Sequence, residues 1–162
     1  MKKINVTIVS AAEEEYPACA DILGSCPEIK IVARPLCLYE PGAWSAISGS
    51  DVLVLDEAML EREGLSVLGA VRHHQPMIKL LLIMDKHNEN KVLEALALGF
   101  TGIIERASLL SMVRKAIPAL YTGETWVSRK LVHALRTQLI RLDSDMLPGV
   151  PVLTPVIHER RN

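Results

Sequence analysis

Asp56 stands at the end of the apolar segment DVLVLD (51–56), and Glu57 follows it directly. The apolar run indicates a buried strand, so the sequence predicts a carboxylate at the C-terminal tip of that strand. Mg²⁺ binds oxygen ligands, usually including one or two carboxylates. Glu13 and Glu14, in an acidic cluster after the first apolar run, are the candidates to assist Asp56 in holding Mg²⁺. We favour the alternative, in which an acidic first turn is solvated and stabilised by the helix dipole.

Two other sets of metal-binding residue types give weaker signals. The three cysteines have no C-x-x-C spacing and no histidine at ligand spacing, so we expect reduced thiols at Cys19, Cys26 and Cys37. His73 and His74 end a predicted helix, where a polar C-terminal cap is the favoured interpretation, and His87 precedes the next helix. The sequence shows no Ser/His/Asp set, P-loop or G-x-G-x-x-G, so we do not expect an enzyme.

An alternation of strands and helices must position these residues. The predicted strands are 4–9, 29–35, 51–56, 78–84 and 101–105. The predicted helical segments are 11–25, a short one within 40–48, 64–74, 89–99, 108–123 and 127–143. Short connections and apolar strands predict an α/β fold, a doubly wound five-stranded parallel sheet. Asp56 would then lie at the carboxyl edge, where such sheets have their functional crevice.

Composition agrees with this fold and limits the functions. Hydrophobic residues make up 49% and aromatic residues only 4%, so Val, Ile, Leu and Ala must build the core. The 18 basic and 19 acidic side chains give a net charge of −1, which creates no general attraction to nucleic acid or anionic membrane. No apolar run approaches the roughly 18 residues of a membrane span, and the N-terminus indicates a strand rather than a signal peptide. We expect a cytoplasmic protein without membrane contact.

The pattern changes after residue 122, which we take as the end of the main domain (1–122). Residues 123–143 predict a linker helix with one apolar stripe, formed by Leu131, Leu135, Leu139 and Leu142. This stripe either packs on the domain or pairs with its copy, and we favour a contact that serves a homodimer. Residues 144–162 contain MLPGVPVLTPV, whose prolines and glycine are typical of a linker.

Three motifs resemble receiver domains of two-component signal transduction. DEAMLEREGLSVLGAVR (56–72) resembles their D-x-x-M-P-x-x-x-G-L-x-x-L-x-x-x-R pattern. ALALGFTGIIER (95–106) resembles the A-L-x-x-G-A-x-G-Y-L-L-K ending of that fold. GETWVSRKL (123–131) is similar to the G-E-x-W-x-S motif of NarL/LuxR-type response regulators. The resemblance covers roughly residues 3–142 and implies the flavodoxin-like receiver fold, strand order 2-1-3-4-5, with an extra C-terminal helix.

The resemblance implies a phosphorylation switch and also shows where this chain departs from it. In the family, a histidine kinase phosphorylates the strand-three aspartate, an acid pair after strand one holds Mg²⁺, and a Thr or Ser and a Lys bind the phosphoryl oxygens. Asp56 matches the phosphoacceptor, but Ser10 and Ala11 replace the acid pair. Met84 replaces the hydroxyl and cannot donate a hydrogen bond to phosphate, while Arg106 replaces the Lys.

We therefore predict an atypical, or pseudo-, receiver with Asp56 as an inherited remnant. Arg106 is expected to form an ion pair with Asp56 or Glu57. The domain would control dimerisation and transcriptional output without ordinary Mg²⁺-dependent aspartyl phosphorylation. One alternative is a conventional phosphorylated receiver, with Asp56 as phosphoacceptor and Glu13 or Glu14 assisting the metal. Another is a flavodoxin-like cofactor-binding protein, although the turn SAAEEE lacks a phosphate cradle.

The last residues of the sequence bear on a possible DNA partner. Leu153, Thr154 and Pro155 resemble the start of the LuxR-type helix-turn-helix, but the following residues depart from it. We expect the chain to be the N-terminal part of a transcription regulator, which reaches DNA only through a C-terminal domain absent from this sequence.

Overall fold

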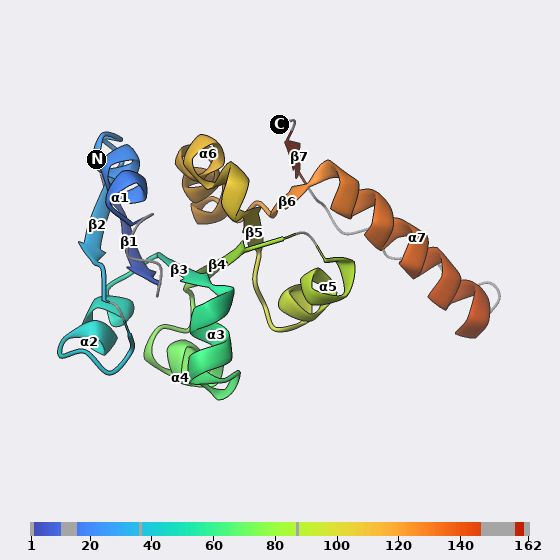
Figure 1. Ribbon diagram of the computed structural model, residues 1–162, viewed down its shortest axis with the longest axis horizontal. Helices are drawn as coiled ribbons and strands as arrows, with labels where there is room; N and C mark the ends of the chain where they lie inside the picture. The colour runs from blue at the N-terminus through green and yellow to red at the C-terminus, as the bar shows by residue number, and fades with distance from the viewer. Residues whose placement is uncertain (1, 11–15, 36, 87, 147–157, 161–162) are drawn as a thin grey trace.

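The computed structural model shows an α/β fold, in which one parallel sheet is covered by helices on both faces (Figure 1). The structure describes residues 2–10, 16–35, 37–86, 88–146 and 158–160. Seven strands pair in the order β2-β1-β3-β4-β5-β6-β7, and all neighbours are parallel. The strands are β1 (Ile4–Val9), β2 (Ile29–Ala33), β3 (Val52–Asp56), β4 (Lys79–Met84), β5 (Gly102–Glu105), β6 (Trp126–Ser128) and β7 (His158–Arg160).

The predicted fold class is confirmed, because the first five strands form the expected doubly wound sheet in the order 2-1-3-4-5. Two three-residue strands that the sequence analysis did not predict, β6 and β7, extend the sheet beyond β5. Strand β6 coincides with the tryptophan motif GETWVSRKL, and Trp126 is buried there. The tryptophan motif thus forms an extra strand whose aromatic side chain is buried in the core.

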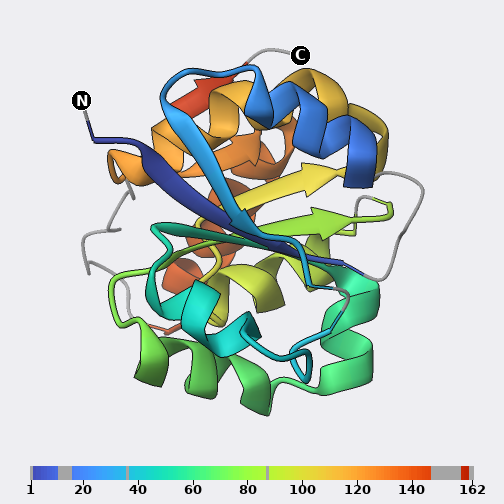
Figure 2. The same ribbon diagram turned by 90° about the vertical axis from the view of Figure 1, so that its left-hand side faces the viewer.

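The helices form two layers around the sheet. Helices α1 (Tyr16–Gly24) and α6 (Leu109–Tyr121) pack on one face (Figure 2). The other face carries α2 (Ala43–Ser48), α3 (Glu57–Glu63), α4 (Ser66–His74), α5 (Glu89–Ala97) and α7 (Arg129–Met146). A short 3-10 turn, η1 (Arg106–Ser108), joins β5 to α6. Because both faces of the sheet are covered, the central strands are apolar throughout, and every residue of β3 is buried.

Strand register brings the carboxyl ends of the central strands to one edge. Val9 at the end of β1 pairs with Leu55, so Ser10, which follows β1, lies beside Asp56. Asp56 in turn pairs with Ile83, one residue before the end of β4, and Met84 pairs with Glu105 at the end of β5. Residues that are far apart in the sequence therefore meet around Asp56.

Two helices differ from the sequence prediction. Residues 57–63, to which no element was assigned, form α3, and Gly64 separates α3 from α4 with a φ of 81° that favours glycine. Helix α7 extends to Met146, past the predicted end at residue 143. Of the predicted linker 144–162, residues 147–157 and 161–162 lie outside the described part of the chain.

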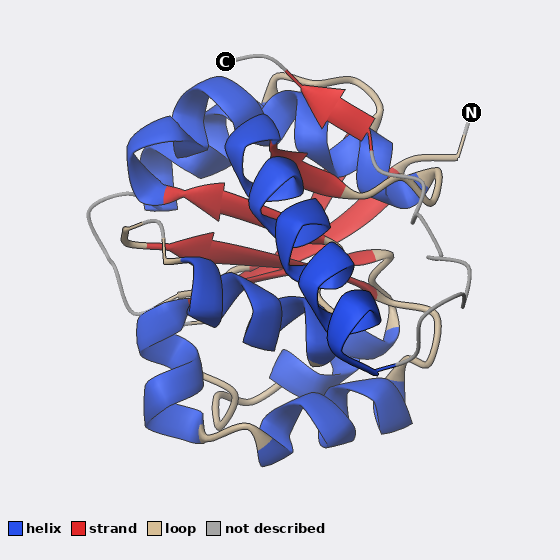
Figure 3. Cartoon of the chain, turned by 90° about the vertical axis from the view of Figure 1, so that its right-hand side faces the viewer, coloured by secondary structure: helices blue, strands red, loops and turns tan. Residues whose placement is uncertain are grey.

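Helix α7 lies across the β6 end of the molecule (Figure 3). Its buried residues Val132 and Leu135 join the same core cluster as α5 and β6, which fixes the first half of the helix on the domain. None of the described helices combines the length and the apolarity that crossing a bilayer requires.

Candidate functional site

Asp56 is fully buried, and both of its carboxylate oxygens have partners. Oδ1 accepts a hydrogen bond of 2.8 Å from the Met59 backbone N–H, so Asp56 is the N-cap of α3. Oδ2 accepts a hydrogen bond from Ser10 Oγ, the residue that follows β1. Arg106 Nη2 lies 3.8 Å from the same Oδ2. The acid at the strand tip is therefore held by one helix, one hydroxyl and one cation.

Arg106 also binds a second carboxylate. Its Nε donates a hydrogen bond of 2.7 Å to Asp85 Oδ1, in the residue that follows β4. The side chain of Arg106 is 21% exposed, whereas that of Asp85 is 59% exposed, so the guanidinium spans from the buried acid to the surface. We call Asp56, Arg106 and Asp85 the acid–arginine cluster. The ion pair that the sequence analysis expected between Arg106 and Asp56 is present.

Glu57, the alternative partner expected for Arg106, makes other contacts. Its Oε1 accepts a hydrogen bond of 3.2 Å from the Asp85 backbone N–H, and its Oε2 lies 3.3 Å from Lys91 Nζ on α5. Glu57 therefore links α3 to the loop after β4 and to α5. Through Asp85, it adjoins the acid–arginine cluster.

Asp85 is the member of the site that the sequence analysis missed. Its signal was available, because a carboxylate directly after an apolar strand must lie at the same sheet edge as Asp56 and Arg106. Met84 is 1% exposed at the end of β4.

The described residues do not fit a carboxylate-rich Mg²⁺ site around Asp56. The nearest oxygen donor from β1 is the neutral hydroxyl of Ser10, which already donates its proton to Asp56. The guanidinium of Arg106 lies where it would repel a divalent cation at Oδ2. Among the described residues, no group of three or more His, Cys, Asp or Glu side chains gathers as metal ligands do. Ala11, Glu13 and Glu14 lie outside the described residues.

The remaining candidates lie elsewhere. His73 and His74 are exposed in the last turn of α4, and the His74 ring lies 4.6 Å from that of Trp44. His87 lies outside the described residues. Cys19 and Cys26 are buried and Cys37 is partly buried, and all three are free thiols, as expected.

The predicted leucine stripe of α7 divides into two parts. Leu135 is buried against the domain, so it faces the core rather than a partner. Leu139 is 37% exposed and Leu142 is 56% exposed, and Ile140 between them is 59% exposed. The side chain of Leu131 lies outside the described set. The second half of α7 thus carries exposed apolar side chains.

Comparisons with known proteins identify the fold. No protein-family model and no curated protein matches the sequence. Among solved structures, a two-component response regulator of the LuxR family from Aurantimonas sp. SI85-9A1 matches with a TM-score of 0.72 and 15% identity, over 86% of this chain and 99% of that chain.

Two further structures agree with this match. The signal receiver domain of the response regulator NarL from Mycobacterium tuberculosis has a TM-score of 0.66 and 22% identity, over 76% of this chain and 100% of that chain. The Salmonella typhimurium response regulator RcsB, described for its conformational dynamism for DNA interaction, has a TM-score of 0.67 and 16% identity, over 91% of this chain and 79% of that chain. The chain therefore has the receiver fold, and its structural neighbours are receiver domains of LuxR/NarL-type response regulators.

Proposed function

We propose that the chain is a regulatory receiver-type domain of a DNA-binding response regulator that works without ordinary Mg²⁺-dependent phosphorylation of Asp56. The observation that carries this proposal is the occupation of both Asp56 oxygens, by the Met59 N–H at Oδ1 and by Ser10 and Arg106 at Oδ2. The function is regulatory rather than catalytic, in keeping with the receiver fold of the structural neighbours.

The chemistry of phosphoryl transfer supports the proposal. Capture of a phosphoryl group requires an accessible acceptor oxygen and a metal that neutralises the charge of the transition state. Asp56 offers neither in this arrangement, because it is fully buried, caps α3 with one oxygen and meets a hydroxyl and a guanidinium with the other. Arg106 supplies a fixed positive charge beside the carboxylate, so Asp56 has a cationic partner without a metal or a phosphoryl group.

A titration with Mg²⁺ and beryllofluoride, a phosphoryl analogue, tests this proposal. We expect no saturable change in the amide NMR signals of Asp56, Met59 or Asp85. The matched control is the triple variant Ser10→Asp, Met84→Thr, Arg106→Lys, which restores one acid of the pair, the hydroxyl and the lysine of the family and should gain a response. A saturable change in the unmodified chain would refute the proposal.

The alternative of a conventional receiver assisted by Glu13 or Glu14 makes the opposite prediction. Acetyl phosphate would then add one phosphoryl group to the intact chain, and Asp56→Asn would abolish that addition. Intact mass spectrometry with and without Mg²⁺ measures both outcomes, and no histidine kinase is needed for the test.

We further propose that the domain controls a homodimer through the exposed apolar part of α7, and thereby the spacing of DNA-binding domains. Leu139, Ile140 and Leu142 supply that surface. Sedimentation equilibrium should show that Leu139→Lys with Leu142→Lys weakens self-association. Leu110→Lys, at an exposed leucine on α6, is the control and should leave it unchanged. A monomeric parent chain at high concentration would contradict this part of the proposal. We place the protein in the cytoplasm, where its three free thiols would stay reduced.

A further inference from the structure

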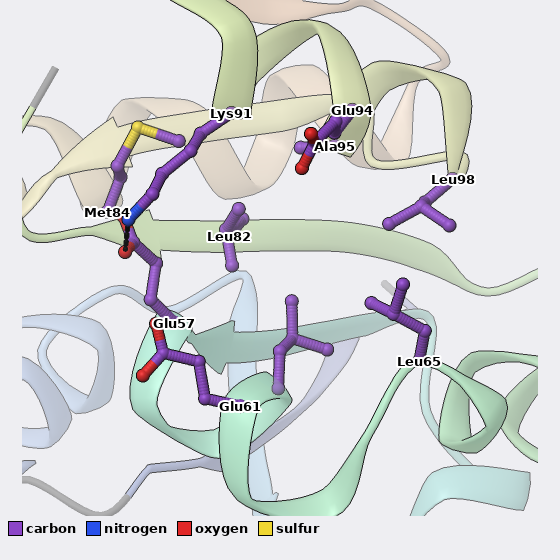
Figure 4. Close-up of a pocket in the computed structure, with 10 residues that line it drawn as sticks. Glu57, Glu61, Leu65, Leu82, Met84, Lys91, Glu94, Ala95 and Leu98 are labelled. Atoms are coloured by element: carbon purple, nitrogen blue, oxygen red, sulfur yellow. Dashed lines mark hydrogen bonds and ion pairs between the residues drawn. The ribbon is translucent and has the colours of Figure 1, made fainter. Parts of the chain in front are cut away.

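A cavity of about 140 Å³ lies next to the acid–arginine cluster, between α3 and α5 and above β4 (Figure 4). Its apolar lining comes from α3, β4 and α5 and from the residues next to these helices, and consists of Leu60, Leu65, Leu82, Met84, Ala95 and Leu98. The volume is close to that of an engineered apolar cavity of about 150 Å³ that binds benzene. The apolar part of a ligand for this cavity is therefore the size of one six-membered ring.

Charged side chains surround the cavity and give it a negative sign. Glu57, Glu61 and Glu94 line it together with a single lysine, Lys91. Lys91 is paired with Glu57, so these two charges cancel at a distance of 3.3 Å. Glu61 on α3 and Glu94 on α5 form no ion pair with any residue of the described chain. Two acids from opposite walls thus remain to meet a positively charged group.

We propose that this cavity binds a small apolar cation, a ring-sized apolar group that carries an ammonium group. The apolar lining takes the ring, and the carboxylates of Glu61 and Glu94 take the ammonium group at the mouth. Apolar surface supplies most of the affinity, and the charges select a cation over a neutral or anionic ligand. An anion of the same shape would meet two uncompensated carboxylates.

The location connects the ligand to the acid–arginine cluster. Glu57 lines the cavity and also accepts the hydrogen bond of the Asp85 N–H, while the Asp85 carboxylate holds Arg106. Met84, which stands at the end of β4, lines the cavity as well. The ligand would therefore be an input that reaches Asp56 without phosphate. This regulatory role rests on the proposed function, but binding itself does not.

Benzylamine, a cation at neutral pH, is the probe for this proposal, with benzyl alcohol as the neutral match and benzoate as the anionic one. We expect saturable shifts of the leucine methyl NMR signals from Leu60, Leu82 and Leu98 with benzylamine. The expected dissociation constant is about millimolar for a ligand of this size. Benzyl alcohol should bind several-fold more weakly, and benzoate should not bind.

Two variants at the mouth test the assignment of charge. Glu61→Gln and Glu94→Gln should each weaken benzylamine binding about two- to five-fold, the range of a solvent-exposed ion pair. Glu89→Gln, in the first turn of the same helix α5 but outside the cavity, is the matched control and should leave binding unchanged. All three positions are exposed, so the fold is retained.

The outcomes separate the binding site from the proposed function. No methyl shift at about ten times the expected dissociation constant would refute the cavity as a binding site, as would equal binding of benzoate. Equal binding of benzyl alcohol would refute the choice of a cation. Binding of benzylamine together with a beryllofluoride response would confirm the cavity and refute the phosphate-independent function. Binding without any change in the Asp85 and Arg106 signals would confirm the cavity and refute its link to the acid–arginine cluster.

Discussion

The ion pair between Arg106 and Asp56 should contribute measurably to stability. The distance of 3.8 Å corresponds to an attraction of about 4 kcal/mol at an effective dielectric constant of about 20. Desolvation of the fully buried carboxylate opposes this attraction, and the 21% exposure of Arg106 adds solvent screening. We expect a net coupling of about 1–2 kcal/mol, above the range of exposed pairs and below the cost of breaking a fully buried pair.

A double-mutant cycle measures this coupling. Asp56→Asn removes the charge but keeps an N-cap oxygen for the Met59 N–H, and Arg106→Met removes the cation but keeps much of the apolar stem. Each single change should lower the free energy of unfolding, and the double variant should lose less than the sum. At a urea m-value of about 2 kcal/mol/M, the coupling corresponds to about 0.5–1 M in the denaturation midpoint. Fluorescence of the buried Trp126 reports unfolding.

The control cycle pairs Asp56→Asn with Arg114→Met. Arg114 is exposed on α6, which packs on the opposite face of the sheet from the helix that Asp56 caps, so these two effects should add. A coupling below about 0.3 kcal/mol in the Asp56–Arg106 cycle, which is within the error of additivity, would show that Arg106 does not stabilise the buried acid. The reasoning about a fixed positive charge at the sheet edge would then fail.

Two further predictions concern two glycines and the charge beside Asp56. Gly102→Ala should destabilise by about 1–3 kcal/mol, because its Cβ would lie 2.7 Å from the Cδ1 of the fully buried Leu81. Gly69→Ala, in helix α4 with open space around it, should instead stabilise the protein by a few tenths to about 1 kcal/mol. Urea denaturation measures the free energy of unfolding of both variants, and a change of the same sign in both would contradict the prediction. The double variant Ser10→Asp with Arg106→Met should place a second carboxylate beside Asp56 and remove the cation that repels a metal, so its melting temperature should fall in the absence of divalent cations and rise again with millimolar Mg²⁺. A melting temperature of this double variant that ignores Mg²⁺ would contradict the argument that the missing acid and the guanidinium together prevent metal binding.

The sequence was sufficient to predict the five strands that form the central sheet. Their apolar residues are buried on both faces, so each strand appears as a continuous run such as KLLLIM in β4. The short strands β6 and β7 carry no such signal. Each has three residues, and their pairing with β5 and with one another depends on tertiary contacts that local patterns do not encode.

The candidate site was predictable in part for a similar reason. Asp56 and Arg106 follow strands, so their positions at one edge followed from the fold, and their expected contact is present. The hydrogen bonds of Asp56 to Ser10 and to the Met59 N–H depend on side-chain rotamers and on the start of α3, a helix with no clear boundary signal in the sequence. Asp85 was missed because its importance comes from its contact with Arg106 rather than from its residue type.

The N-cap contact of Asp56 has a consequence for classifying related chains. An acid at this position accepts a hydrogen bond from a backbone N–H in the first turn of α3, which would otherwise be unpaired. This is a structural role that needs no phosphorylation. The stability of α3 is therefore by itself a reason to keep an aspartate here, whether or not a kinase uses it. Surveys that count a receiver as phosphorylatable because this one position is acidic will include chains in which the residue only serves the architecture.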